Sequence, residues 1–340
     1  MLQLQNETPF NASLMLLPDS EGVDTVFAVI KGTLAIGRNG HLSLPEVQVP
    51  IALADEHHGD PATTSIRTAS DVCLGKPGTD VLVTGSACAP NESPTWQSDV
   101  TLIAAGLTKT VRVFGDRAWE MTGPTARIAW IEPFVHMPLV WERAFGGRDE
   151  STQHPATDTR NPVGRGFRAS GSKKPIAGTA LPNVENPAAL IDSPTAKPAP
   201  AGFAPLSPHW DDRRAYAGTY DERWQKERAP YLPADFDPRF FQLAPRDSIV
   251  PGRLRGGEAF ELHGVRPNEP LRFLLPALDV EITCRLDSSE ETKPALLDTL
   301  TIDADTAQLI LVWRAALRCD KKALKVREVR INLLRGTTEA

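Results

Sequence analysis

The sequence has few cysteines, and their positions do not suggest a disulfide framework or a metal centre. The 340 residues contain four, Cys73, Cys88, Cys284 and Cys319, which lie far apart. There is no Cys-x-x-Cys pair, and no histidine stands at the spacing that would complete a zinc set. We therefore expect four reduced, mostly buried thiols and a fold that needs neither metal nor disulfide.

Long apolar runs and a basic surplus are also missing. The chain starts MLQLQNETPF, without a basic region, and the apolar run that follows covers only residues 14–17, against the roughly 18 that span a bilayer. Lys and Arg number 37 against 43 Asp and Glu, for a net charge of -6. Nucleic-acid binding needs a basic face that neutralises phosphates, so we expect no nucleic-acid partner. Because the apolar run is too short to span a bilayer, we also expect a cytoplasmic protein that does not bind a membrane.

The signatures of nucleotide binding and nucleophilic catalysis do not occur either. The glycine pairs at Gly146-Gly147 and Gly164-Arg165-Gly166 match neither a dinucleotide-binding Gly-x-Gly-x-x-Gly nor a P-loop. No Gly-x-Ser-x-Gly elbow is present, and no cysteine sits in a histidine-paired frame. We expect these glycines to let the backbone turn with positive φ beside bulky neighbours. No catalytic residue and no cofactor follow from the sequence.

Two acidic clusters remain as candidates for chemistry. Residues 55–60, DEHHGD, combine carboxylates with imidazoles but lack His-Glu-x-x-His spacing, so we expect a solvated loop and no metal. Asp221, Glu222, Asp235 and Asp237 lie among aromatic residues, a composition typical of sugar-cleaving sites. Helix capping accounts for Asp221 and Glu222, and a turn accounts for Asp235 and Asp237. A carbohydrate-active or other hydrolase that uses these acids is therefore the alternative function.

Strand patterns dominate both ends of the chain. Short segments rich in β-branched residues alternate with turn residues, and the bends at Asn39-Gly40 and at residues 304–306 indicate two hairpins. We predict a mainly β fold of antiparallel, sandwich-like sheets with a few short helices. The predicted strands cover residues 25–36, 41–53, 79–89, 98–107, 109–116, 126–134, 271–287, 298–303, 308–317 and 324–334.

Between the two β regions lies a segment rich in proline, glycine and aromatic residues. Of the 30 prolines, 17 fall between Pro133 and Pro251, yet the segment has too many aromatics for a disordered linker. We predict an ordered, irregular surface. The predicted division is an N-terminal β region (1–137), a central insert (138–252) and a C-terminal β region (253–340) that forms one compact unit with the first.

One helix is predicted within the insert, over residues 219–229. Thr219 and Glu222 form a capping box, and Pro230 ends the helix. Tyr220 and Trp224 are four residues apart, so they share a face, which we expect to pack inward.

Arginines interleaved with aromatics in the insert are the candidate binding residues. Trp, Tyr and Arg dominate protein–protein hot spots because they bury a large area and bond in several directions. The same side chains can instead pin the loops by stacking and salt bridging within the chain. The candidates for protein binding are Trp141, Arg143, Phe145, Arg165, Phe167, Trp210, Arg213, Arg214, Tyr216, Tyr220 and Trp224.

Several longer segments occur in one order over nearly the whole chain. They are KGTLAI (31–36), KPGTDVLVTGSACAP (76–90), PLVWERAFGG (138–147), NPVGRGF (161–167), LPNVENP (181–187), residues 200–245 and LLDTLTID (296–303). In these segments the chain resembles the family catalogued as domain of unknown function 2169, encoded beside bacterial type VI secretion genes. Trp141 and Phe145 stand where the family often carries Tyr, and both keep an aromatic side chain.

The resemblance implies a bacterial adaptor or chaperone that acts in the cytoplasm. Such a protein helps to load a toxic effector onto the VgrG spike or PAAR tip of the type VI secretion system, and no catalytic residues come with the resemblance. The expected partners are the effector and a VgrG/PAAR spike component. A structural component that stays in the secretion particle is a further alternative.

Overall fold

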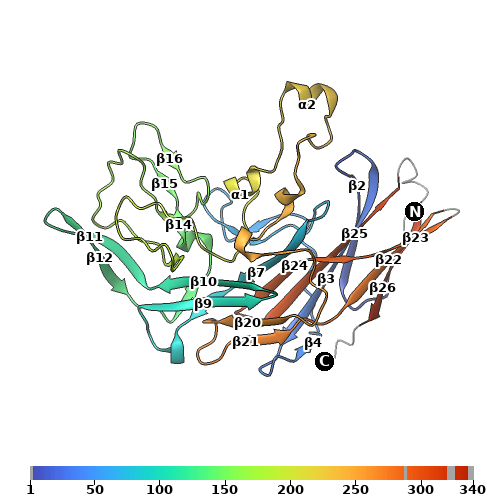
Figure 1. Cartoon of the computed structure of the whole chain (residues 1–340), viewed down its shortest axis with the longest axis horizontal. Coiled ribbons are helices and arrows are strands. Elements are labelled where there is room, and N and C mark those ends of the chain that lie inside the picture. The colour runs from blue at the N-terminus through green and yellow to red at the C-terminus, as the bar shows by residue number, and fades with distance from the viewer. Residues whose placement is uncertain (1–2, 287–288, 320–325, 336–340) are drawn as a thin grey trace.

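The computed structural model describes residues 3–286, 289–319 and 326–335, and it is mainly β (Figure 1). The described residues form several mostly antiparallel sheets and two short α-helices. The predicted fold class is therefore confirmed. Residues 287, 324 and 325, which end or begin two predicted strands, lie outside the described residues.

The largest sheet draws its strands from all three parts of the sequence. Its order is β19-β7-β24-β25-β3-β2, with β4 paired to the end of β3. All neighbours are antiparallel except β7 and β24, which run parallel. The strands are β2 (Asn11–Pro18), β3 (Asp24–Ile36), β4 (Leu42–Ser43), β7 (Gly78–Thr84), β19 (Ile249–Pro251), β24 (Leu296–Asp303) and β25 (Gln308–Arg318).

Both predicted hairpins are present in this sheet. The turn at residues 37–41 joins β3 to β4, although β4 is only two residues long because Pro45 follows it closely. The bend that begins at Ala304 joins β24 to β25, and all of β24 apart from one bulge pairs with residues 308–314 of β25.

Two further sheets share the core with the largest one. An antiparallel sheet has the order β18-β10-β9-β20-β21, and a four-stranded sheet has the order β1-β26-β22-β23. One cluster of buried side chains includes Ile30 of the largest sheet, Val111 of the second and Ile331 of the third. Strands of the N-terminal and C-terminal regions thus enclose the same core. The strands are β9 (Gln97–Ala104), β10 (Leu107–Phe114), β18 (Val184–Glu185), β20 (Ala259–His263), β21 (Leu271–Leu274), β1 (Gln3–Asn6), β22 (Asp279–Leu286), β23 (Glu290–Pro294) and β26 (Val326–Arg335).

Small two-stranded sheets and short helices complete the structure. The hairpin of β11 and β12 projects at one end of the molecule, and β15 and β16 lie above it in Figure 1. The remaining strands are β5 (Glu56–His57), β6 (Ile66–Thr68), β8 (Ser86–Cys88), β11 (Asp116–Thr122), β12 (Thr125–Glu132), β13 (His136–Pro138), β14 (Phe145–Gly146), β15 (Arg148–Asp149), β16 (Ala156–Thr157) and β17 (Arg165–Gly166). The helices are α1 (Asp211–Arg214), α2 (Glu222–Glu227) and the 3-10 turns η1 (Pro90–Glu92), η2 (Trp141–Arg143), η3 (Pro238–Phe241) and η4 (Arg246–Ser248).

The predicted helix exists, but it is shorter and its cap differs. The N-cap of α2 is Asp221, whose carboxylate accepts a hydrogen bond from the Trp224 amide at 2.8 Å. Thr219 instead donates its hydroxyl hydrogen to Asp235 at 2.7 Å. The predicted capping box at Thr219 is therefore wrong, because an aspartate two residues later caps the helix equally well.

The predicted inward face of this helix is also wrong. The helix α2 buries no residue, since it lies at the top of an arm that projects away from the sheets (Figure 1). Tyr220 is 55% exposed. Its ring packs against Trp224, with centroids 4.8 Å apart, instead of against the core.

The cysteines and the paired glycines are as expected. All four cysteines are free and buried. Gly146 and Gly147 have φ of 145° and 107°. A Cβ on Gly146 would lie 2.2 Å from the Asn161 carbonyl oxygen, so no other residue fits there. In the described part of the chain, no helix has the length and apolar character that a membrane crossing requires.

Candidate functional site

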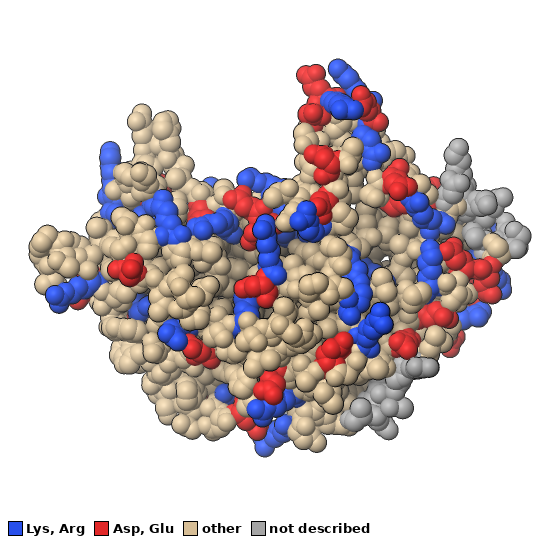
Figure 2. All heavy atoms as spheres, in the orientation of Figure 1, with Lys and Arg blue, Asp and Glu red and all other residues tan. Residues whose placement is uncertain are grey.

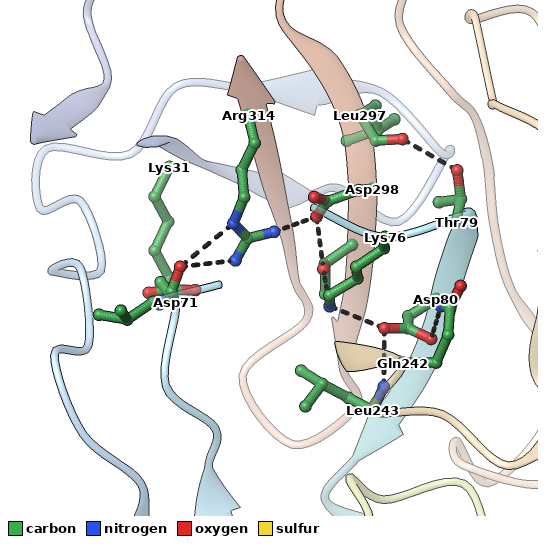
Figure 3. Close-up of polar contacts among 12 residues, drawn as sticks. Lys31, Asp71, Lys76, Thr79, Asp80, Gln242, Leu243, Leu297, Asp298 and Arg314 are labelled. Carbon is green, nitrogen blue, oxygen red and sulfur yellow. Dashed lines mark hydrogen bonds and ion pairs between the residues drawn. The ribbon is translucent and has the colours of Figure 1, made fainter. Parts of the chain in front are cut away.

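Buried polar side chains link the middle of the largest sheet to the end of the insert (Figure 3). Asp80 of β7 is fully buried, and its carboxylate accepts four hydrogen bonds. Two come from Lys76 Nζ (2.7 Å) and Gln242 Nε2 (2.6 Å), and two from the amides of Leu243 (2.9 Å) and Ala244 (3.2 Å). The Asp80 carboxylate thus receives two donors on each of its oxygens. It therefore fixes residues 242–244 against the sheet.

The same chain of contacts continues across three strands. Asp298 is the unpaired residue of a bulge in β24, and its carboxylate accepts from Thr299 Oγ1 (2.9 Å) and from Arg314 Nη1. Arg314 also donates to the carbonyl oxygen of Asp71, whose carboxylate pairs with Lys31 Nζ at 2.8 Å. Each buried charge in this set has an opposite charge beside it, as burial in a low dielectric requires.

A pocket of about 470 Å³ lies beside this network, at the base of the insert. Gln242 belongs to both the network and the pocket, because it donates a hydrogen bond to Asp80 and also lines the pocket. The volume is within the range of ligand pockets, about 300–1,000 Å³. The charged, aromatic and apolar side chains that line the pocket include Leu206, Asp212, Arg213, Tyr216, Arg239 and Arg246.

Arg213 is the most deeply buried charge of the pocket, at 7% exposure. Its Nε donates to the carbonyl of Phe240 (2.9 Å) and its Nη1 to the carbonyl of Leu206 (2.8 Å). Within the described residues it forms no ion pair. Burial lowers the pKa of this guanidinium, and the negative charges of Asp55 and Asp80 act against that effect. An arginine nevertheless remains protonated, so the pocket contains a buried positive charge.

Two further arginines of the pocket lie over the ring of Tyr216. The guanidinium carbons of Arg239 and Arg246 lie 4.3 Å and 5.9 Å from the centre of its ring. Arg239 has a close carboxylate partner, Asp237, at 2.5 Å. Arg246 has only Asp212, at 3.9 Å, and both of these side chains are exposed. The weaker pair leaves Arg246 free to bond another group.

A buried lysine positions the turn that carries Arg246. Lys109 of β10 donates to the carbonyl of Gly202 (2.5 Å), to the carboxylate of Asp247 (2.6 Å) and to the hydroxyl of Ser248 (3.1 Å). Burial lowers the pKa of Lys109, while Asp247 raises it. These contacts hold η4 against the second sheet, so one wall of the pocket is fixed by the strands beneath it.

Three of the predicted binding residues lie in the interior. Trp141, Phe145 and Trp210 are 3%, 2% and 1% exposed. Trp141 and Trp210 meet edge to face with centroids 5.7 Å apart, and Trp141 Nε1 donates to the carbonyls of Ala204 and Pro205 at 3.1 Å. In this conformation these three side chains hold the loops of the insert together instead of forming its surface.

Two predicted arginines also make contacts within the insert. Arg143 and Arg165 both donate to the side-chain oxygen of Asn183 at 3.1 Å. Arg143 pairs in addition with Asp116 at 3.2 Å. Phe167 is half-buried against the cluster that contains Phe145. The structure therefore divides the predicted residues into interior contacts, the pocket with Arg213 and Tyr216, and the arm with Tyr220 and Trp224. Arg214 is exposed and pairs with Asp211 at 2.8 Å.

Comparison with known proteins identifies a family. The family described as "Uncharacterized protein conserved in bacteria (DUF2169)" matches residues 21–314. The chain belongs to this family. No curated protein and no solved structure matches the chain. The DUF2169 match spans the buried network, the pocket and the arm.

The acids considered for a hydrolase site have structural partners in this DUF2169 chain. The hydrogen bonds from Thr219 lower the pKa of Asp235, and the hydrogen bond from Arg239 lowers that of Asp237. A general acid at neutral pH needs a raised pKa, so neither carboxyl is suited to proton donation. Among the described residues, residues 55–60 included, no three His, Cys, Asp or Glu side chains are grouped to hold a metal.

Sequence reasoning missed Arg239 and Arg246 of the pocket. Both lie in the segment PRFFQLAPRD, which has the same alternation of arginine and aromatic residues as the chosen candidates. It also missed two exposed tryptophans, Trp96 and Trp130, whose rings meet at 5.7 Å near the base of the β11–β12 hairpin. They are isolated in the sequence, so no local pattern indicated them.

Proposed function

We propose that this DUF2169 protein is a non-enzymatic adaptor that binds a type VI secretion effector and helps to load it onto the VgrG/PAAR spike. The observation that carries the proposal is the projecting arm of residues 217–236. It presents Tyr220 and Tyr231, which are 55% and 40% exposed, on a segment that buries no side chain of its helix. Exposed aromatic residues on a projection suit a protein that binds another protein.

The arm is held in place before any partner binds. Arg228 Nη2 donates to the carbonyl of Ser20 in the β2–β3 turn at 2.7 Å, and Trp224 Nε1 donates to the carbonyl of Tyr231 at 2.8 Å. A surface ordered in advance loses less conformational entropy on association. Figure 2 shows charged side chains of both signs around the tip of the arm, which keep this projection hydrated in the free protein.

The test combines binding with localisation. The tagged full-length protein is expressed with the effector and spike genes that lie beside its own, and co-purifying proteins are identified. We expect an effector to co-purify and the adaptor to stay in the cell fraction while the effector is secreted. Tyr220→Ala should weaken the complex about tenfold, or about 1.4 kcal/mol. The control is Leu274→Ala, which removes another exposed large side chain, on β21 and away from the arm.

Three outcomes would contradict the proposal. The absence of any co-purifying effector would remove the adaptor role. Recovery of this protein in the secreted particle would favour the structural component. Hydrolysis of a glycan that is lost in Asp235→Asn would favour the hydrolase.

A further inference from the structure

We propose that the pocket between α1, η3 and η4 binds a carboxylate group carried by a peptide segment of the partner protein. The identity of the partner rests on the proposed function, whereas recognition of a carboxylate rests on the pocket alone. The carboxylate can belong to an Asp or Glu side chain or to a chain terminus, since the chemistry is the same.

The charges of the pocket do not balance. Arg239 and Arg246 have the carboxylates of Asp237 and Asp212 as partners, at 2.5 Å and 3.9 Å. Arg213 forms no ion pair among the described residues, and its partners are two carbonyl oxygens and the Phe240 ring, whose centroid lies 5.2 Å from the guanidinium carbon. The lining of the pocket thus contains three arginines and one acid, Asp212, and is positive overall. Burying a charge without an opposite charge is costly, and an incoming anion offsets that cost. The charge complementarity thus selects an anionic ligand.

The donors that remain match a carboxylate. Within the described residues, the hydrogen bonds of Arg213 come from Nε and Nη1, which leaves Nη2 without a partner. The Arg246 guanidinium is exposed and weakly paired. Planar guanidinium groups bind carboxylates through two parallel hydrogen bonds. A carboxylate placed between these two arginines would receive donors from both.

The rest of the lining favours a peptide over a small free anion. Leu206, Ile249 and Tyr216 line the same pocket and provide apolar and aromatic surface beside the arginines. This surface would cover a neighbouring side chain of a peptide. On the face shown in Figure 2, Lys and Arg are interspersed with Asp and Glu instead of forming a patch of one sign. An anionic segment would therefore be recognised locally, at this pocket.

The direct test is fluorescence anisotropy with the full-length protein. The probe is the fluorescein-labelled peptide Gly-Ser-Glu-Leu-Asp-Phe-Glu-Gly. It is compared with a version that carries Gln and Asn in place of Glu and Asp, and each is made with a free and an amidated C-terminus. We expect saturable binding of the acidic peptide that weakens with salt, and at least tenfold weaker binding of the amide version. Loss of binding on C-terminal amidation alone would identify the terminus as the recognised group.

Variants assign the binding to the pocket. Arg246→Gln should weaken binding of the acidic peptide at least fivefold, because it removes a weakly paired guanidinium from the pocket. This side chain is exposed, so its loss leaves the fold intact. The matched control is Arg214→Gln, an exposed arginine of the same α1 region that does not line the pocket. Its affinity should equal that of the wild type. Arg213→Gln is measured with a thermal melt, since this side chain also ties α1 to η3.

The outcomes separate this inference from the proposed function. Equal binding of the acidic and amide peptides, no saturable binding of either, or equal losses in Arg246→Gln and Arg214→Gln would overturn the pocket assignment. Full competition by glutarate at the peptide's own concentration would overturn the preference for a peptide. If the effector co-purifies equally well with wild type and Arg246→Gln, the adaptor role stands and the pocket fails. If the peptide binds but no effector does, the pocket stands and the adaptor role fails.

Discussion

Replacing Asp80 by asparagine tests whether the buried network holds the insert on the sheet. The side chain of Asp80 is fully buried, and that of its partner Lys76 is 1% exposed. Asn keeps the shape but not the charge, so the Lys76 ammonium would be left in the core without a counter-ion. Removing one partner of a buried ion pair costs about 3–5 kcal/mol. That is a large part of the roughly 5–15 kcal/mol by which a domain is stable.

The expected change can be measured as a melting temperature. A destabilisation of 1 kcal/mol lowers Tm by about 2–4 °C in domains of 150–250 residues, and less in larger ones. Taking about 2 °C per kcal/mol, Asp80→Asn should lower Tm by about 6–10 °C, followed by circular dichroism or calorimetry. Asp99→Asn is the matched control. Its pair with Arg112 is partly exposed, at 41% and 31%, and such pairs contribute about 1 kcal/mol or less.

A double-mutant cycle separates the ion pair from the other contacts of Asp80. Lys76→Met removes the charge that Asp80→Asn leaves unpaired, so the double variant should be more stable than the sum of the single effects by about 2 kcal/mol. If Asp80→Asn melts within about 1 °C of Asp99→Asn, the assignment of Asp80 as the anchor of the insert is refuted. Additive single effects would show instead that the amide hydrogen bonds dominate.

Three further predictions follow from individual groups. Asp221→Ala should speed amide hydrogen exchange in α2 about fivefold, because loss of an N-cap costs about 1 kcal/mol. An equal effect in Thr219→Ala would show that Thr219 caps the helix after all. Burial raises the pKa of the Cys284 thiol to about 11, so iodoacetamide at pH 8 should label it only after denaturation, and rapid labelling of the native protein would contradict its burial. Burial acts to raise the pKa of Asp149, but hydrogen bonds from Ser151 hold it below the usual value. The stability it contributes is therefore present above the unfolded pKa of about 3.9 and is lost as pH falls toward the folded value, so Asp149→Asn should flatten the fall in Tm below about pH 4.

The strands could be predicted because their signals are local. Alternating β-branched residues mark β9 and β10, and the bend after β24 lies between two apolar runs. The order of strands could not be predicted in the same way. The parallel pairing of β7 with β24 joins residues more than 200 positions apart, such as Asp80 and Thr299. Neither segment contains a pattern that indicates the strand with which it pairs.

The site was only partly predictable, for a related reason. Composition selected the correct residue types in the insert, and Arg213 and Tyr216 do line the pocket. An irregular segment has no period, however, so nothing in the sequence indicates which side of the chain faces inward. Trp141 and Phe145 therefore looked like surface candidates, although both are buried.

The buried charges explain how an irregular insert can present a defined pocket. Apolar contacts alone are tolerant of small shifts, so they would let the loops settle in several positions. Asp80 bonds two successive amides of the insert and Lys109 bonds three oxygens near η4, and each of these contacts is satisfied in one arrangement only. An unsatisfied buried charge is costly, so alternative arrangements are disfavoured. Arg213 is the exception, because among the described residues it forms no ion pair and its partners are two carbonyl oxygens and the Phe240 ring. The network that positions the pocket is thus complete without a partner, and for this reason we propose the pocket at Arg213, and not the network, as the place of recognition.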